Sequence, residues 1–186
     1  MEVKDSFLVY AAGLSMTLTP GGAGSIIKSH ILKIKTGKSF SSTSPIIIYE
    51  KWLELVAIIT IIGFLLLSVD VIESQIIFLI GILLSGFIFF AFKNSLGIDL
   101  LNKLTEKIKF LNKFKVDKKE FVSTSKILIQ PKTLFQLLSI TFLSKIIPMV
   151  AVYFVFQMFD VTFDIFITSQ IYFTSLVAGL LTFIPG

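Results

Sequence analysis

Apolar positions gather into five runs along the chain, separated by short polar segments and one long lysine-rich segment. The first run, 7–18, is shorter than the roughly 20 residues of a helical membrane crossing, so we expect a partial or re-entrant helix there. The other four runs lie at 45–68, 75–92, 134–159 and 163–184. This pattern predicts an all-α fold, a polytopic transmembrane helix bundle that forms a single domain over residues 1–186.

Composition supports a membrane protein. Hydrophobic residues make up 54% of the chain, and the mean hydropathy of +0.89 is high for a soluble domain. The chain has no cysteine, which excludes disulfides and thiolate metal sites. The net charge is +5, and all 17 basic residues are lysine. No recognition motif for nucleic acid accompanies this charge, so cytoplasmic loops beside an anionic leaflet explain it better.

The distribution of charge predicts the topology. Lysines gather at 28–38, between the first two runs, and at 93–132, between the third and fourth. The two remaining loops carry acids and no lysine: Asp70, Glu73, Asp160 and Asp164. Because lysine-rich loops stay in the cytoplasm, we expect a multi-pass protein of the cell membrane with five crossings, its N-terminus outside and its C-terminus inside.

The basic loop 93–132 has an internal pattern. Apolar residues recur at helical spacing from Ile98 to Leu111, and lysines fall off that stripe. This predicts an amphipathic helix, which either lies on the inner membrane surface or is a solvated linker packed on its own protein.

Charged residues also occur within the apolar runs. Glu50 and Glu54 are one helical turn apart, and Lys51 reaches Glu54 at i, i+3. They form either an interfacial ion cluster, with Trp52 as an aromatic anchor, or a site that senses a charged headgroup. Just before them, the Ser/Thr cluster 39–44 predicts N-capping and a turn.

Lys145 lies about eleven residues into its run, too deep for easy snorkelling. An ammonium there needs a carboxylate, a carbonyl or a lipid phosphate. Glu50 and Glu54 are its natural protein partners, so a structural ion pair and a phosphate-binding role are both open.

A helix-breaking motif, Pro20-Gly21-Gly22-Ala23-Gly24, follows the first run, with Lys28 just beyond it. Proline removes a backbone donor and glycine permits unusual dihedrals, so the break frees polar backbone groups that need partners. Phosphate-loop, metal-cluster and catalytic-triad patterns are missing from the sequence, and the single histidine, His30, has no ligand neighbours. We therefore expect no cofactor, no metal and no enzymatic activity.

Three segments together resemble the transmembrane region of lysylphosphatidylglycerol synthases, a flippase-like family. They are Thr19–Leu32 with the Pro-Gly-Gly-x-Gly motif, the turn Thr36-Gly37-Lys38-Ser39-Phe40, and the helix start Tyr49–Leu55 with Glu-Lys-x-x-Glu. The ending Pro185-Gly186 looks like the start of the family's second such motif.

The family pattern differs from this sequence at four positions. Ser25 stands where the family usually has Glu, Lys28 and Lys51 replace Arg, and Glu54 replaces Asp. Lysine keeps the charge but lacks the bidentate fork that suits phosphate. Since the family usually has further spans on both sides, the chain resembles a partial copy of a larger domain.

The resemblance implies a membrane domain that binds or translocates a phospholipid or a polyprenyl-phosphate lipid. Two helix breaks would form half-sites of a polar pathway for an anionic headgroup. The candidate residues are Pro20, Gly21, Gly22, Gly24, Lys28, Glu50, Lys51, Glu54 and Lys145. The alternative is a non-transporting anchor or partner module for a glycosyltransferase or an aminoacyl-lipid synthase. Expected partners are membrane lipids and such enzymes, not nucleic acid.

Overall fold

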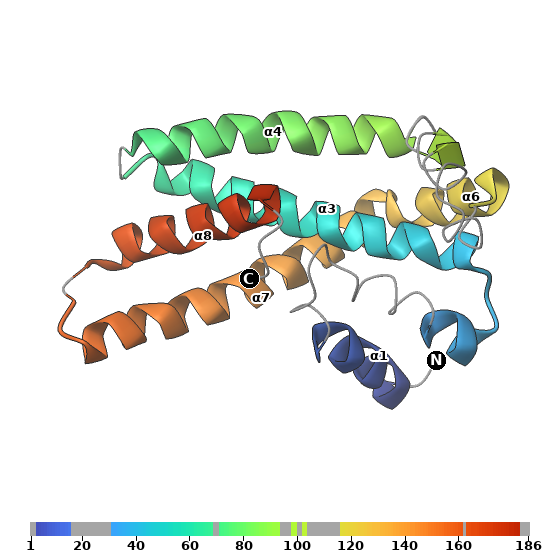
Figure 1. The fold of residues 1–186 in the computed structure, drawn as a ribbon, viewed down its shortest axis with the longest axis horizontal. Helices are drawn as coiled ribbons and strands as arrows, with labels where there is room; N and C mark the ends of the chain where they lie inside the picture. Colours follow the sequence, from blue (N-terminus) through green and yellow to red (C-terminus); the bar gives the residue numbers. More distant parts are fainter. Residues whose placement is uncertain are drawn as a thin grey trace. The chain divides into compact units, whose positions relative to one another are not determined.

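A computed structural model describes residues 3–15, 31–68, 71–93, 98–99, 102–103, 116–161 and 163–182. Regular secondary structure within these residues is entirely helical, which confirms the predicted all-α fold. The main helices are α1 (Val3–Ser15), α3 (Phe40–Leu65), α4 (Ile72–Lys93), α6 (Lys118–Leu128), α7 (Pro131–Met158) and α8 (Ile165–Thr182) (Figure 1). The Pro20–Gly24 motif, Lys28, Pro185-Gly186 and most of the predicted amphipathic stretch lie outside the described residues.

Helix α3 begins earlier than the apolar run that predicts it. Ser39 caps it, since the Ser42 backbone N–H donates to Ser39 Oγ at 3.2 Å. The prediction of a turn over the following residues is wrong, because they are helical and Pro45 lies inside α3. Proline leaves the Ser41 carbonyl without its usual N–H donor, and Ser44 Oγ donates to that carbonyl at 3.4 Å.

The chain divides into two compact units. The described part of the first comprises 3–15, 31–50 and the described residues within 87–130. Its core is formed by Ile98, Val116 and Phe121. Helix α6 belongs here and is capped by Asp117, whose Oδ1 accepts from the Glu120 N–H at 3.0 Å. The basic loop 93–132 therefore contains a short helix that its apolar pattern did not reveal.

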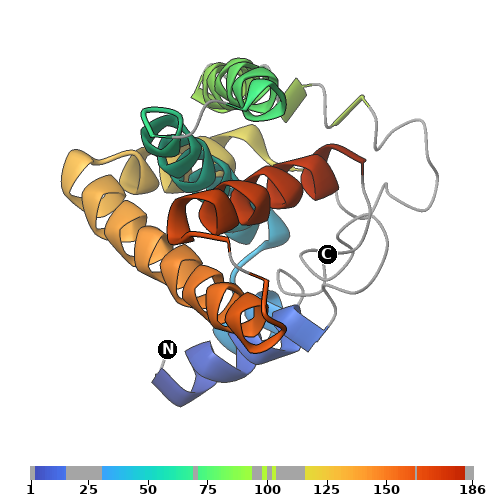
Figure 2. The ribbon, with the colours of Figure 1, turned by 90° about the vertical axis from the view of Figure 1, so that its left-hand side faces the viewer.

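The second unit comprises Lys51–Gly86 and Pro131–Thr182. It holds the C-terminal part of α3, most of α4, and all of α7 and α8, whose ribbons lie side by side (Figures 1 and 2). Its buried core joins three of these helices through Ile58 and Ile62 of α3, Met149 of α7, and Phe173 and Val177 of α8. The candidates Lys51 and Glu54 of α3 and Lys145 of α7 lie within this unit.

The turn between α7 and α8 ends α7 sharply. Asp160 has a positive φ of 57°, in the left-handed region, and the Val161 N–H donates back to the Phe156 carbonyl at 3.0 Å. Such a left-handed residue is a common way to end a helix, and aspartate tolerates it better than most side chains. At the start of α8, Asp164 Oδ1 caps the new helix by accepting from the Ile167 N–H at 2.8 Å.

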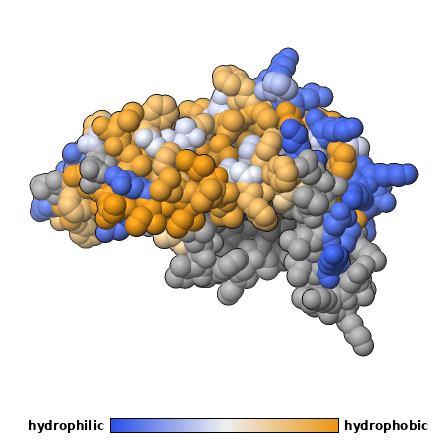
Figure 3. Space-filling view, turned by 90° about the horizontal axis from the view of Figure 1, so that it is seen from above, coloured by the Kyte–Doolittle hydropathy of each residue, from blue (hydrophilic) through white to orange (hydrophobic). Residues whose placement is uncertain are grey.

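Within the part of the chain that the structure describes, two helices are long and apolar enough to cross a membrane. They are Ile72–Ala91 within α4, with a mean hydropathy of 2.3, and α7, with 1.9; Ile165–Gly179 within α8 is apolar but shorter. Several of their large apolar side chains are exposed, such as Phe87 and Phe135, and hydrophobic residues cover much of the surface that Figure 3 shows. An apolar exterior is what lipid-facing helices require. The number of crossings and the orientation stay predictions.

Helices α3 and α4 approach closely at two glycines. A Cβ at Gly81 would lie 2.7 Å from Cγ1 of Ile59, and a Cβ at Gly63 would lie 2.8 Å from Cε2 of Phe78. Real Cβ atoms essentially never come this close to another atom. Glycine therefore fits both positions because it has no side chain.

We expect Gly81→Ala to be less stable than Gly86→Ala by about 1–3 kcal/mol, because a methyl group at Gly81 must displace Ile59. Gly86 lies on the same helix with open space around it, so the two variants share the gain in helix propensity. Reversible unfolding in mixed detergent measures the difference. Equal stabilities of the two variants would show that the protein's stability does not depend on the close approach of α3 and α4 at Gly81.

Candidate functional site

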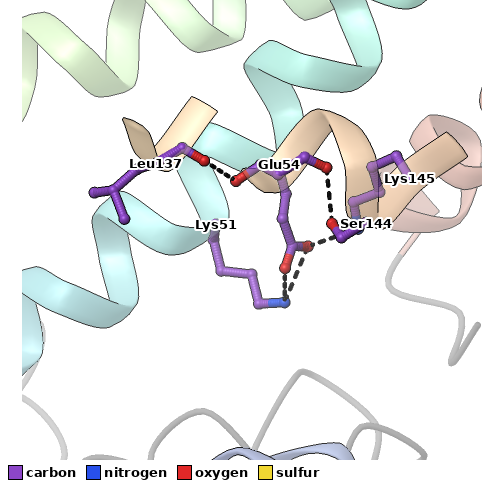
Figure 4. Close-up of polar contacts among 6 residues, drawn as sticks. Lys51, Glu54, Leu137, Ser144 and Lys145 are labelled. Carbon is purple, nitrogen blue, oxygen red and sulfur yellow. Dashed lines mark hydrogen bonds and ion pairs between the residues drawn. The ribbon is translucent and has the colours of Figure 1, made fainter. Parts of the chain in front are cut away.

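Three charged side chains meet between α3 and α7. Glu54 lies at the centre, and its Oε2 is 3.2 Å from Lys51 Nζ and 3.5 Å from Lys145 Nζ (Figure 4). We call Lys51, Glu54 and Lys145 the charged cluster. Glu54 and Lys145 keep only 24% and 20% of their side-chain surface exposed, whereas Lys51 keeps 52%. The cluster thus has a partly buried ion pair and a more accessible second ammonium.

The position of Lys145 explains why it needs this partner. It lies near the middle of α7, with about 20 Å of helix on either side. A lysine at that depth is costly unless an acid or another polar group faces it. The structure places it against Glu54, one of the two acids that the sequence offered, and this settles which of them supplies the protein partner.

Nearby hydroxyls are already bonded within α7. Ser144 Oγ donates to the Thr141 carbonyl at 2.7 Å, and Thr141 Oγ1 donates to the Leu137 carbonyl at 2.8 Å; Figure 4 shows these bonds beside the cluster. Among the described residues, Glu54 is the one polar partner that the structure gives Lys145. Because an ammonium has three N–H donors, further acceptors can bind it.

Trp52 helps to fix the rotation of α3 about its own axis, through contacts on the side of the helix opposite to Glu54. Its indole Nε1 donates to the carbonyl and the hydroxyl of Ser85 on α4, both at 3.1 Å. Residues two apart on a helix point in nearly opposite directions. Holding Trp52 against α4 therefore turns Glu54 toward α7. The sequence suggested Trp52 as an interfacial anchor, but its hydrogen bonds show that it also joins two helices.

The net charge of the cluster is positive. Two ammonium groups surround one carboxylate, so one positive charge is left over when all three are ionised. A positive charge within an apolar helix bundle attracts anionic groups strongly, because screening there is weak. The arrangement is suited to holding a phosphate or carboxylate rather than a cation. No group of three or more metal-ligating side chains occurs in the part of the chain that is described.

Of the remaining candidates, the structure describes Glu50. Glu50 is partly buried on α3, in the segment that belongs to the first unit. Pro20, Gly21, Gly22, Gly24 and Lys28 lie outside the described residues, so their role stays a prediction.

Comparison with known protein families shows which family this chain belongs to. The family model described as the lysylphosphatidylglycerol synthase TM region matches residues 1–186, the whole chain. The chain belongs to this family. No curated protein and no solved structure matches the chain.

Membership of the lysylphosphatidylglycerol synthase TM family confirms the resemblance inferred from three short segments. Together with the apolar α4 and α7, it makes the chain a membrane protein of this family. The matched region includes Lys51, Glu54 and Lys145. All three residues lie in the second unit.

Sequence reasoning missed a second set of polar residues. Ser74, Gln170 and Thr174 lie on α4 and α8, within or beside apolar runs. A signal was present, because Thr168, Ser169 and Gln170 are three consecutive polar residues in the run 163–184. Thr168, Ser169 and Gln170 are all buried.

A double-mutant cycle tests the ion pair. We expect a coupling of about 1–3 kcal/mol between Lys145→Met and Glu54→Gln, since one substitution alone leaves a partly buried charge without its partner. The cycle of Lys51→Met with Glu54→Gln is the matched control, and we expect at most about 0.5 kcal/mol from that more exposed pair. Unfolding in mixed detergent measures both. Zero coupling for Lys145 would contradict the assignment of Glu54 as its partner.

Proposed function

We propose that this membrane protein binds or translocates an anionic lipid, a phospholipid or a polyprenyl phosphate. The observation that supports this most is the charged cluster, which has an excess positive charge near the middle of an apolar helix. The pair of Lys145 with Glu54 is neutral by itself, and a second ammonium, that of Lys51, stands beside the same carboxylate.

The two lysines differ in a way that suits a passing headgroup. Lys51 is the more exposed and is held by a helix-surface contact that is weak in general. A lipid phosphate can meet Lys51 first and then compete with Glu54 for Lys145. Exchange of one anion for another keeps the ammonium paired at each stage, which lowers the cost of moving a charged headgroup through the bundle.

The remaining candidates extend this pathway as sequence-based predictions. The Pro20-Gly21-Gly22 break would supply free backbone N–H groups on the cytoplasmic side, with Lys28 beside them. Glu50, one turn before Glu54, would act as a further counter-ion along α3. The lysine-rich loops would face the cytoplasm of a multi-pass protein in the cell membrane. This polar pathway is non-enzymatic and needs no cofactor.

Transport in proteoliposomes tests the proposal. We expect the purified protein to move fluorescent phosphatidylglycerol between leaflets, as measured by dithionite quenching. Lys145→Ala should lower the rate about tenfold or more, because hydrogen bonds to charged groups contribute about 1.5–3 kcal/mol. Glu50→Gln should also lower it. Lys132→Ala is the matched control, since Lys132 is exposed near the start of the same helix.

The opposite results are equally informative. Wild-type rates in both Lys145→Ala and Glu50→Gln would overturn the pathway. If the wild-type protein moves no lipid but retains a purified glycosyltransferase or aminoacyl-lipid synthase encoded beside it, the function is that of an anchor or partner module instead.

A further inference from the structure

An ion pair joins the start of α1 to the lysine-rich segment that follows it. Asp5 lies in the first turn of α1, and its Oδ1 is 2.6 Å from Lys35 Nζ. Lys35 belongs to a short helix over residues 31–36, which lies with α1 in the first unit. Both side chains are partly exposed, so the pair contributes little to stability. It nevertheless shows that the start of α1 and the helix 31–36 lie beside each other.

This contact bears on the topology of the chain. Two atoms 2.6 Å apart lie on the same side of a bilayer whose hydrocarbon core is about 30 Å thick. The lysines at 28–38 are expected in the cytoplasm, because lysine-rich loops stay there. Asp5 is then cytoplasmic as well, and Lys4 beside it fits the same rule. The contact therefore argues against the sequence-based expectation that the chain begins outside.

The length of α1 argues against a crossing. Its 13 residues span about 20 Å, less than the core of a bilayer. A crossing that began at Asp5 would also need a return before residue 31, because Lys35 lies on the starting side. The intervening residues 16–30 include Pro20, three glycines and Lys28, so they do not supply the roughly 20 apolar residues of a second crossing.

The exposed face of α1 is apolar. Phe7, Leu8 and Tyr10 are 67%, 57% and 50% exposed, whereas Val9 is 3% exposed. At 3.6 residues per turn, the three exposed side chains share an arc of about 160°, centred opposite Val9. A helix that is apolar on its buried side and on its outward side is typical of a membrane environment. The outward face of α1 thus suits acyl chains better than water.

The helix 31–36 has the character of a membrane surface. Ile34 is 70% exposed and stands between Lys33 and Lys35, which are exposed as well. Lysines beside an exposed apolar residue can extend their ammonium groups to water while the apolar residue enters the lipid. The ion pair of Asp5 with Lys35 then lies at the surface, with α1 leading from it into the leaflet.

We propose that α1 is embedded in the leaflet on the side of the helix 31–36 and does not cross the membrane. Its partner is the acyl chains of that leaflet, against Phe7, Leu8 and Tyr10. The chain then has one crossing fewer than the five that its apolar runs predict. This placement of α1 does not depend on lipid binding by the charged cluster, so either can fail without the other.

Cysteine labelling tests the side on which α1 begins. The chain has no cysteine, so each introduced cysteine reports on one position. Lys4→Cys and Lys33→Cys are exposed positions on the two helices, and Ser68→Cys is an exposed position just after α3, beside the lysine-free loop. We expect a membrane-impermeant maleimide to label Ser68→Cys in intact cells. Lys4→Cys and Lys33→Cys should both lose this labelling and regain it after permeabilisation. Labelling of Lys4→Cys together with Ser68→Cys, while Lys33→Cys stays protected, would overturn the proposal.

Fluorescence quenching in proteoliposomes tests the partner of the apolar face. A bimane label at Leu8→Cys should be quenched by nitroxide on lipid acyl chains and protected from aqueous iodide. Lys4→Cys, one turn earlier on the same helix, is the matched control and should show the reverse. If Leu8→Cys does not fold, Phe7→Cys on the same exposed face carries the test. Quenching of the labelled apolar face by iodide to the extent seen for Lys4→Cys would show that α1 lies in water, and would overturn the proposal.

Discussion

The structure of the second unit depends on one constraint, the need of a lysine in the middle of an apolar helix for an opposite charge. Lys145 satisfies it with Glu54 of α3, 3.5 Å away. Water is scarce at such a position, so the ion pair is costly to break even if it contributes little relative to an apolar core. This fixes which face of α3 points toward α7. It also places the carboxylate between two ammonium groups, which is the origin of the positive charge that we assign to lipid binding.

Helix α3 carries the polar contacts that organise its neighbours. On one side Glu54 meets α7, and on the other Trp52 bonds to Ser85 of α4. Close approach at Gly63 and Gly81 brings α4 against α3, while Ile58 and Ile62 pack into the core with α8. The side chains of Trp52 and Glu54 thus link α3 to α4 and to α7.

The unit therefore has two polar regions of different chemistry. The charged cluster is positive and includes the middle of α7, whereas Ser74, Gln170 and Thr174 are neutral polar residues of α4 and α8. Lipids combine a charged phosphate, polar hydroxyl groups and apolar chains in one molecule. Under the function that we propose, the charged cluster binds the phosphate and the apolar exterior of the helices faces the acyl chains.

The sequence by itself determined the apolar helices, because hydrophobic runs and their lengths are local properties of the chain, but it did not reveal the polar helix α6. It also determined the family and identified Lys145 as a residue that needs a partner. It could not choose between Glu50 and Glu54, which lie one turn apart on α3, and it did not mark Gln170. Those outcomes depend on how helices rotate and meet, as where Ser74 bonds Thr174 a hundred residues away. Only the tertiary structure decides such pairings, since many rotations bury the same apolar surface while few bring a given pair of polar atoms within 3 Å.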